Sequence, residues 1–115
     1  MSAQPMHPVG ARYFYMVTFE IDAADEALFN EIYDTEHIPN ILKVPGVLGI
    51  TRFRDHAPNE RGWLVYSAMY YLAKADLPDT PEWKAESDKG RWAPLIRPRV
   101  KSRQRRLGKI VEASY

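Results

Sequence analysis

The spacing of apolar residues along the chain predicts four β-strands. Residues 12–21 (RYFYMVTFEI) and 63–72 (WLVYSAMYYL) are dense in aromatic and β-branched types and place apolar side chains on both faces of a strand. Two further strands are predicted at 47–55, after the turn Val44-Pro45-Gly46, and at 99–111, where the pattern alternates. A strand with two apolar faces needs cover on both, typically helices on one face and a second sheet on the other.

The segment between the first two strands predicts an amphipathic helix. Asp22 is a candidate cap, and residues 25–42 follow with helical spacing. Pro39 lacks a backbone N–H group, so we expect it to kink or end this helix near its last turn. The side that faces the core is predicted to carry Leu28, Phe29, Ile32 and Tyr33.

A second helix is predicted between the third and fourth strands. Asp79 or Thr80 is placed to cap it, and the helix is expected to run over residues 81–89 and to stop at Gly90. The residues that follow, 92–98, contain prolines and are predicted to form an irregular connector to the last strand.

The order strand-helix-strand-strand-helix-strand predicts a ferredoxin-like α+β domain. It would hold a four-stranded antiparallel sheet with both helices on one face. The face that the helices leave uncovered would expose a large apolar surface, so we expect a homodimer in which two sheets pair face to face as a dimeric α+β barrel. Residues 1–11 hold two prolines and a glycine and are expected to form a flexible arm, and residues 12–115 form the single domain.

The composition narrows the classes of function. A chain of 115 residues allows one hydrophobic core, and the absence of cysteine excludes disulfides, a thiolate nucleophile and the common structural zinc sites. No phosphate-binding glycine loop, dinucleotide fingerprint or metal-ligand spacing of histidines occurs, so neither a metal nor a cofactor is predicted. No apolar stretch suits a signal peptide or a membrane span, and we expect a cytoplasmic protein without a membrane partner.

One segment carries residues suited to chemistry. Tyr33 and His37 are four residues apart, so a helix makes them neighbours one turn apart, and Glu36 lies beside His37 in the sequence. Histidine titrates near neutral pH, which suits it to general acid or base catalysis. At about 100° per residue, however, His37 lies nearly opposite Leu28 and would face solvent unless the helix bends.

The sequence YDTEHIPNILKVPG, from Tyr33 to Gly46, resembles the EthD-like branch of the dimeric α+β barrel superfamily. The shared features are a tyrosine, a short acidic spacer, His-Ile-Pro, and then Val-Pro-Gly opening a strand, and the expected element order extends the resemblance over residues 12–111. The resemblance implies a homodimer with a pocket in each protomer between helices and sheet. Within it, His37 matches the motif histidine that faces the pocket, and Tyr33 matches the aromatic residue one turn earlier.

Relatives in that superfamily include cofactor-independent monooxygenases, lactone isomerases, dehydratases and haem-degrading enzymes. The first hypothesis is therefore a small cofactor-independent isomerase, dehydratase or other lyase, or monooxygenase that acts on a hydrophobic cyclic or aromatic metabolite. His37 would move a proton, and Tyr33 would position or polarise an oxygen atom. The substrate pocket is expected to be lined by aromatic side chains, namely Phe29, Tyr15, Tyr71, Trp83 and Trp92.

Two alternatives stay open at this point. The first is a non-catalytic dimer that binds a small ligand or supports another protein, in which Trp83 and Trp92 seal a core or a dimer seam. The second uses the seven Lys and Arg residues of the segment 97–109 to bind nucleic acid. With a net charge of +1 and no aromatic RNA-recognition signature, we interpret that segment as an edge strand whose charges discourage aggregation, and predict no nucleic-acid partner.

Overall fold

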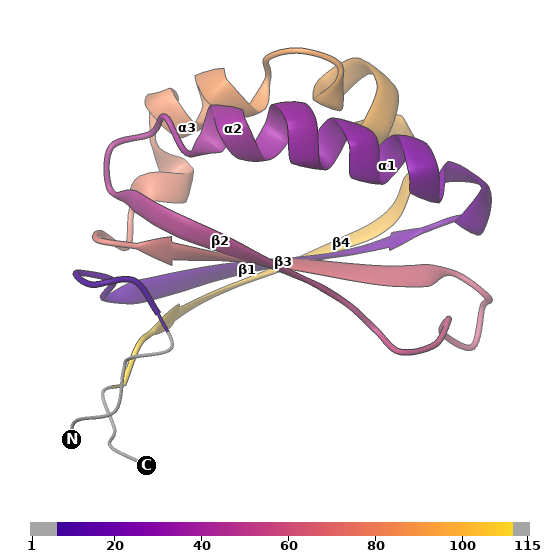
Figure 1. Ribbon diagram of the computed structural model, residues 1–115, viewed down its shortest axis with the longest axis horizontal. Helices are drawn as coiled ribbons and strands as arrows, with labels where there is room; N and C mark the ends of the chain where they lie inside the picture. The colour runs from indigo at the N-terminus through magenta and orange to yellow at the C-terminus, as the bar shows by residue number, and fades with distance from the viewer. Residues whose placement is uncertain (1–6, 112–115) are drawn as a thin grey trace.

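A computed structural model describes residues 7–111 and shows the predicted order of strands and helices (Figure 1). The strands are β1 (Tyr13–Ile21), β2 (Val47–Arg54), β3 (Leu64–Leu72) and β4 (Val100–Lys109). They form one sheet in the order β2-β3-β1-β4, and every neighbouring pair is antiparallel. This arrangement confirms the ferredoxin-like α+β prediction.

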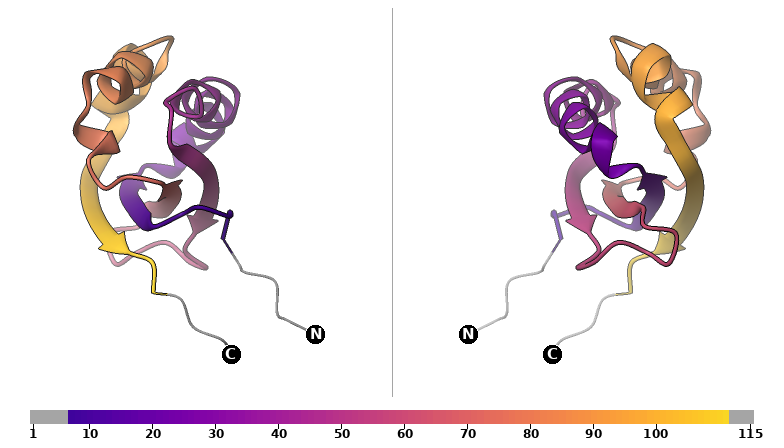
Figure 2. Two further views of the ribbon diagram at one scale, coloured as in Figure 1. Left: turned by 90° about the vertical axis from the view of Figure 1, so that its left-hand side faces the viewer. Right: turned by 90° about the vertical axis from the view of Figure 1, so that its right-hand side faces the viewer.

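The helical segments all lie on one face of the sheet (Figures 1 and 2). The first runs without interruption through α1 (Glu26–Ile32), a π-helical turn at Tyr33–His37 and α2 (Ile38–Ile41). The second begins with α3 (Pro81–Ser87). Thr80 accepts a hydrogen bond from the Trp83 N–H at 3.3 Å and caps α3 as expected. Asp22 accepts one from the Ala24 N–H at 2.9 Å and caps the 3₁₀ turn Ala23–Asp25 that leads into α1.

The segment predicted as an irregular connector is helical, which corrects that prediction. It forms a π-helical turn at Trp92–Ile96 and then a single 3₁₀ turn at Arg97–Arg99. Pro94 is tolerated because it lies in the first turn of this helix, where a backbone N–H group has no partner within the helix. The chain therefore reaches β4 through a packed helix rather than through a loop.

The core lies between the helices and one face of the sheet. Alternate residues of β1 and β3 point into it, and Phe29, Ile32 and Tyr33 meet them from the first helix. Leu28, predicted to share this core stripe, is only half-buried at its edge. The buried residues of the two central strands are Tyr15, Val17, Phe19 and Ile21 of β1, and Leu64, Tyr66, Ala68, Tyr70 and Leu72 of β3.

No helix among the described residues covers the opposite face of the sheet. Its centre is made by half-buried side chains of β1 and β3, and Phe53 of β2 is 46% exposed beside them. The residues that alternate with the core positions are Phe14, Met16, Thr18 and Glu20 of β1, and Val65, Ser67, Met69 and Tyr71 of β3. This open face is the surface on which the sequence led us to expect a second copy of the chain.

The expected N-terminal arm lies only partly within the described residues. Of the expected N-terminal arm, residues 1–6 lie outside the described residues, whereas Ala11 is buried and donates a backbone hydrogen bond to Pro8 at 3.2 Å. No helix in the described part of the chain is long and apolar enough to cross a membrane.

Candidate functional site

A π-helical turn places His37 inside the molecule. The N–H of Ile38 donates to the carbonyl of Tyr33, five residues earlier, instead of to the carbonyl four residues earlier. The wider turn inserts one residue into the helical repeat, so positions after it are rotated relative to Leu28. His37 is consequently 6% exposed rather than on the solvent side where an uninterrupted helix would place it.

A second π-helical turn supplies the ring that covers His37. The N–H of Arg97 donates to the carbonyl of Trp92, again five residues earlier. The Trp92 indole is buried and stacks on the His37 imidazole, with ring centroids 4.2 Å apart and an interplanar angle of 23°. The site is therefore built where two π turns, far apart in the sequence, face each other.

The His37 imidazole is held in its neutral form. Its Nδ1 atom is buried and has no hydrogen-bond partner among the described residues. Burial lowers the pKa of His37 to about 3, and the positive charges of Arg97 and Arg103 act in the same direction. A neutral imidazole has one nitrogen that can accept a proton, although the low pKa makes His37 a weak base in the ligand-free protein.

Tyr33 presents its ring to His37 and its hydroxyl to another partner. The ring centroids of Tyr33 and His37 are 5.0 Å apart in an edge-on arrangement. The Tyr33 hydroxyl lies 2.5 Å from that of Tyr70, and burial raises the pKa of Tyr33 well above its ordinary value. The Arg52 guanidinium lies over the Tyr33 ring, 4.6 Å from the centre of that ring. Tyr33 thus stays protonated, with its hydroxyl engaged away from the imidazole.

The other aromatic residues expected to line a pocket divide among three places. Phe29 packs against Tyr33 and Trp92, at 5.4 and 6.0 Å between centroids. Tyr15 and Trp83 pack against each other, with centroids 5.6 Å apart, on the far side of Tyr70 from Tyr33 in the same core. Tyr71 is on the open face of the sheet, because side chains alternate along β3, and this corrects its expected place in a pocket beside His37.

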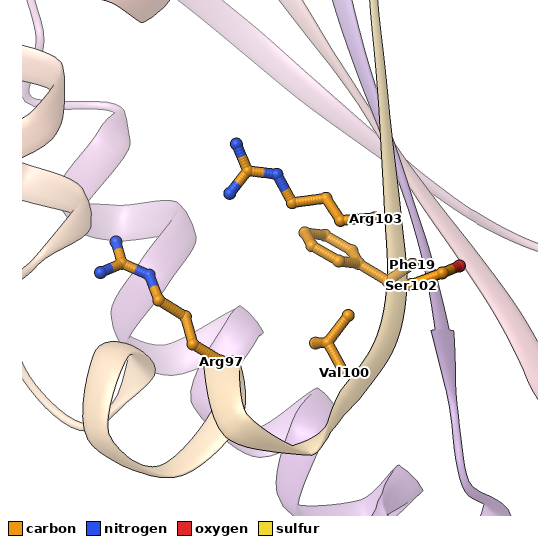
Figure 3. A pocket seen from close by; sticks show the side chains of 5 residues that line it. All are labelled: Phe19, Arg97, Val100, Ser102 and Arg103. Carbon is orange, nitrogen blue, oxygen red and sulfur yellow. The ribbon is translucent and has the colours of Figure 1, made fainter.

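A cleft of about 260 Å³ opens on the β4 side of the helical layer (Figure 3). In Figure 3, Arg97 extends from the helical turn on one side, and Arg103 extends past Phe19 from the strand on the other. Phe19 also packs against Trp92, with centroids 5.6 Å apart, so one aromatic layer separates the cleft from His37. The lining residues are Phe19, Arg97, Val100, Ser102 and Arg103.

Neither arginine was singled out from the sequence as a site residue. Both belong to the basic segment that we interpreted as a solvated edge strand. The feature that locates Arg103 is the register of β4. Arg103 pairs with Phe19 of β1, so its side chain lies on the face of the sheet that the helices cover. A bulge precedes it: Ile21 pairs with Val100 and Glu20 with Ser102, which leaves Lys101 as an extra residue. The simple alternation of charges in β4 is therefore interrupted.

An ion-pair clasp joins the two π turns on their outer side. The Arg91 backbone N–H donates to Glu36 Oε1 at 2.9 Å, and its guanidinium Nε donates to Glu36 Oε2 at 2.5 Å. The same guanidinium reaches Glu31 at 3.2 Å. These contacts with Arg91 lower the pKa of Glu36, which is held in the clasp rather than at His37. No group of three residues able to hold a metal ion occurs among residues 7–111.

Comparison with solved structures gives a consistent fold. Similar structures include a dimeric ferredoxin-like protein from an uncultured marine organism, with a TM-score of 0.63, 11% identity, and 91% of this chain and 92% of that chain covered. SnoaB, a cofactor-independent oxygenase from Streptomyces nogalater, has a TM-score of 0.62, 14% identity, and 90% and 96% coverage. A protein of the ethyl tert-butyl ether D (EthD) family from Bacillus halodurans has a TM-score of 0.57, 19% identity, and 86% and 99% coverage.

No family model matches the sequence, and no curated protein matches it. At identities below one fifth, the likeness to these structures establishes the fold and leaves activity to be argued from the site. The chain has the ferredoxin-like α+β fold that these structures share.

Proposed function

We propose that this protein is a small cofactor-independent enzyme of EthD-like type that removes a proton from a hydrophobic cyclic or aromatic metabolite, with His37 as the base. The observation that carries this proposal is the buried, neutral imidazole of His37, whose Nδ1 atom has no hydrogen-bond partner in the described part of the chain. A buried polar atom without a partner is costly, and such atoms are kept where a ligand or a reaction uses them.

The low pKa of His37 in the ligand-free protein is compatible with its role as the base, because the charge that forms on the substrate raises that pKa. In the ligand-free protein, burial, Arg97 and Arg103 all disfavour the imidazolium form. Removal of a proton beside a carbonyl group creates a negatively charged enolate. That charge offsets the two arginines and stabilises the imidazolium, so the basicity of His37 rises as the transition state is approached.

The other aromatic residues shape the site in this proposal. Trp92 fixes the plane of the imidazole by stacking, and Tyr33 and Phe29 wall the site from the helix side. Isomerisation, dehydration and oxygenation remain possible outcomes, because each of them can start with the same deprotonation beside a carbonyl. The open face of the sheet pairs with a second copy of the chain, in keeping with the structural neighbour described as dimeric.

A second function is favoured by a different observation. His37 is not among the residues that line the cleft, and the Trp92 ring lies over it. A non-catalytic dimer that binds a small ligand in the cleft would need His37 only as a packing residue. The two functions differ in whether a ligand ever reaches the imidazole.

Exchange of carbon-bound hydrogen in D₂O separates these two functions without knowledge of the final product. A panel of cyclic ketones, lactones and hydroxyaromatic compounds is incubated with the protein. Deuterium uptake is followed by NMR at the carbon next to the carbonyl or, in the hydroxyaromatic compounds, at the ring carbons ortho to the hydroxyl. We expect the wild-type protein to accelerate exchange of at least one compound, His37→Asn to lose that acceleration, and His56→Asn, altered in an exposed loop, to retain it. Equal exchange by wild type and His37→Asn would refute the role of His37.

A further inference from the structure

Two arginines converge on the cleft from separate elements. Arg97 comes from the 3₁₀ turn that follows the second π turn, and Arg103 comes from β4. Both line the cleft, and Figure 3 shows Arg97 reaching it from the helical side and Arg103 from the strand side. Phe19, which is 5% exposed, and Val100 form an apolar floor beneath them. The cleft therefore joins an apolar surface to a positively charged wall.

The charge of this wall is only partly balanced by the protein. The Arg97 guanidinium lies 2.7 Å from Asp88 and 3.1 Å from the Ser87 hydroxyl, which fix its position. Arg103 has no ion-pair partner among residues 7–111. Both arginines also lower the pKa of His37, which places their charge within electrostatic reach of the imidazole. An anion bound here would complete the pairing of Arg103 and lie on the cleft side of the aromatic layer that covers His37.

Two of the neighbouring cations are engaged elsewhere, and Arg105, which pairs with Val17 on the same face of β4 as Arg103, does not line the cleft. Arg99 pairs with Asp25 at 3.5 Å, and the ammonium group of Lys101 lies 5.8 Å from the centre of the Trp63 ring. A polyanion such as nucleic acid needs a row of cations at phosphate spacing. Two arginines over an apolar floor are better suited to one planar anion, because a guanidinium fork matches the two oxygens of a carboxylate.

We infer, building on the proposed function, that Arg97 and Arg103 form an anion subsite and that the substrate is a one- or two-ring cyclic or aromatic compound bearing a carboxylate. The carboxylate binds Arg103, with Arg97 beside it, and the ring lies on Phe19 and Val100. The cleft, about 260 Å³, lies just below the range of small-molecule sites, which span roughly 300 to 1,000 Å³, so it suits a compact ligand.

The test measures binding, so that it does not depend on turnover. Naphthoate and its neutral isostere naphthamide are titrated into the full-length protein and followed by calorimetry and by tryptophan fluorescence. We expect naphthoate to bind at least about tenfold more tightly than naphthamide, because charge-assisted hydrogen bonds are stronger than neutral ones. Arg103→Gln should lower the preference for naphthoate about tenfold, and Arg103→Lys should restore part of it. Lys74→Gln removes a charge from an exposed turn and should leave the preference unchanged.

The outcomes also separate this inference from the proposed function. Equal binding of naphthoate and naphthamide, or full binding of naphthoate by Arg103→Gln with unchanged circular dichroism, overturns the anion subsite even if His37-dependent exchange is observed. Selective binding of naphthoate that Arg103→Gln abolishes supports the subsite even if no compound shows exchange, in which case only the catalytic role of His37 fails. Inorganic phosphate that displaces naphthoate at equal concentration would overturn the choice of a ring-bearing carboxylate as ligand.

Discussion

The two π turns of this protein share their construction and differ in what they carry. In each, the N–H of the residue after the turn donates to the first residue of the turn, and a proline follows directly, as Pro39 in the first and Pro98 in the second. A proline ring clashes with the carbonyl four residues earlier in a regular helix, and a widened turn relieves that clash. The similarity shows that one local solution was used in both halves of the fold.

The difference between the turns assigns them separate tasks. The first turn ends in a titratable ring, His37, whereas the second begins with a non-titratable ring, Trp92, and leads directly to Arg97. One half of the fold therefore presents a possible base, and the other half presents the surface and the charge that keep this base neutral. Substitutions in only one of the two turns test how far the base in the first turn depends on the ring and the charge of the second.

The largest expected effect concerns the charge state of His37. Its pKa is about 3 in the folded protein and 6.5 ordinarily, so between these values the unfolded chain binds more protons. The stability contributed by neutral His37 is complete above pH 6.5 and is lost as the pH falls towards 3, by up to about 4 to 5 kcal/mol. The measurement is the free energy of unfolding in urea from pH 7.5 to pH 4 (roughly the window between the two pKa values).

A matched pair of variants isolates this histidine from the carboxylates that titrate in the same range. His37→Gln should show a flatter loss of stability with falling pH than wild type, and His56→Gln should follow the wild-type curve, because His56 is exposed. Parallel curves for wild type and His37→Gln would show that His37 is protonated as readily in the folded protein as in the unfolded chain.

Removal of the covering ring is expected to have the next largest effect. Trp92→Ala deletes a buried indole that packs on His37, Phe19 and Tyr33, and we expect a loss of about 3 to 5 kcal/mol in the free energy of unfolding. Trp63→Ala, at a half-buried position before β3, is the matched control and should cost clearly less. NMR titration should also show the pKa of His37 rising towards 6.5 in Trp92→Ala, since water then reaches the imidazole.

Much of the fold follows from local pattern in the sequence. The four strands, the caps at Asp22 and Thr80 and the single-sided helical layer were predictable, because apolar spacing, capping side chains and turn residues all indicated the same elements. His37 was a candidate because of its motif rather than its helical position. An ideal helix placed it in solvent, and only the inserted residue of the π turn brings it inside.

The remaining features of the site depend on tertiary structure. A π turn is selected by the packing of both helices around it, and its cost is not visible in a periodicity of 3.6 residues. The place of Arg103 depends on a bulge at Lys101, since one extra residue reverses which side chains face the helices. Tyr71 was expected in the pocket and lies on the open face for a different reason, which was already present in the sequence: side chains alternate along β3, so Tyr71 faces away from its neighbour Tyr70.

The smallest effect is expected at the clasp that joins the turns. Arg91→Gln removes the guanidinium shared by Glu36 and Glu31, both at the surface, so the melting temperature should fall only slightly. Glu31→Gln removes only the outer contact, so its melting temperature should fall less than that of Arg91→Gln. The pKa of Glu36 is lowered by Arg91, so the stability from this pair is present above the ordinary carboxyl pKa and is lost as the pH falls through the lowered value. Equal melting curves for wild type and Arg91→Gln at pH 7 would indicate that the aromatic stack alone holds the two turns together.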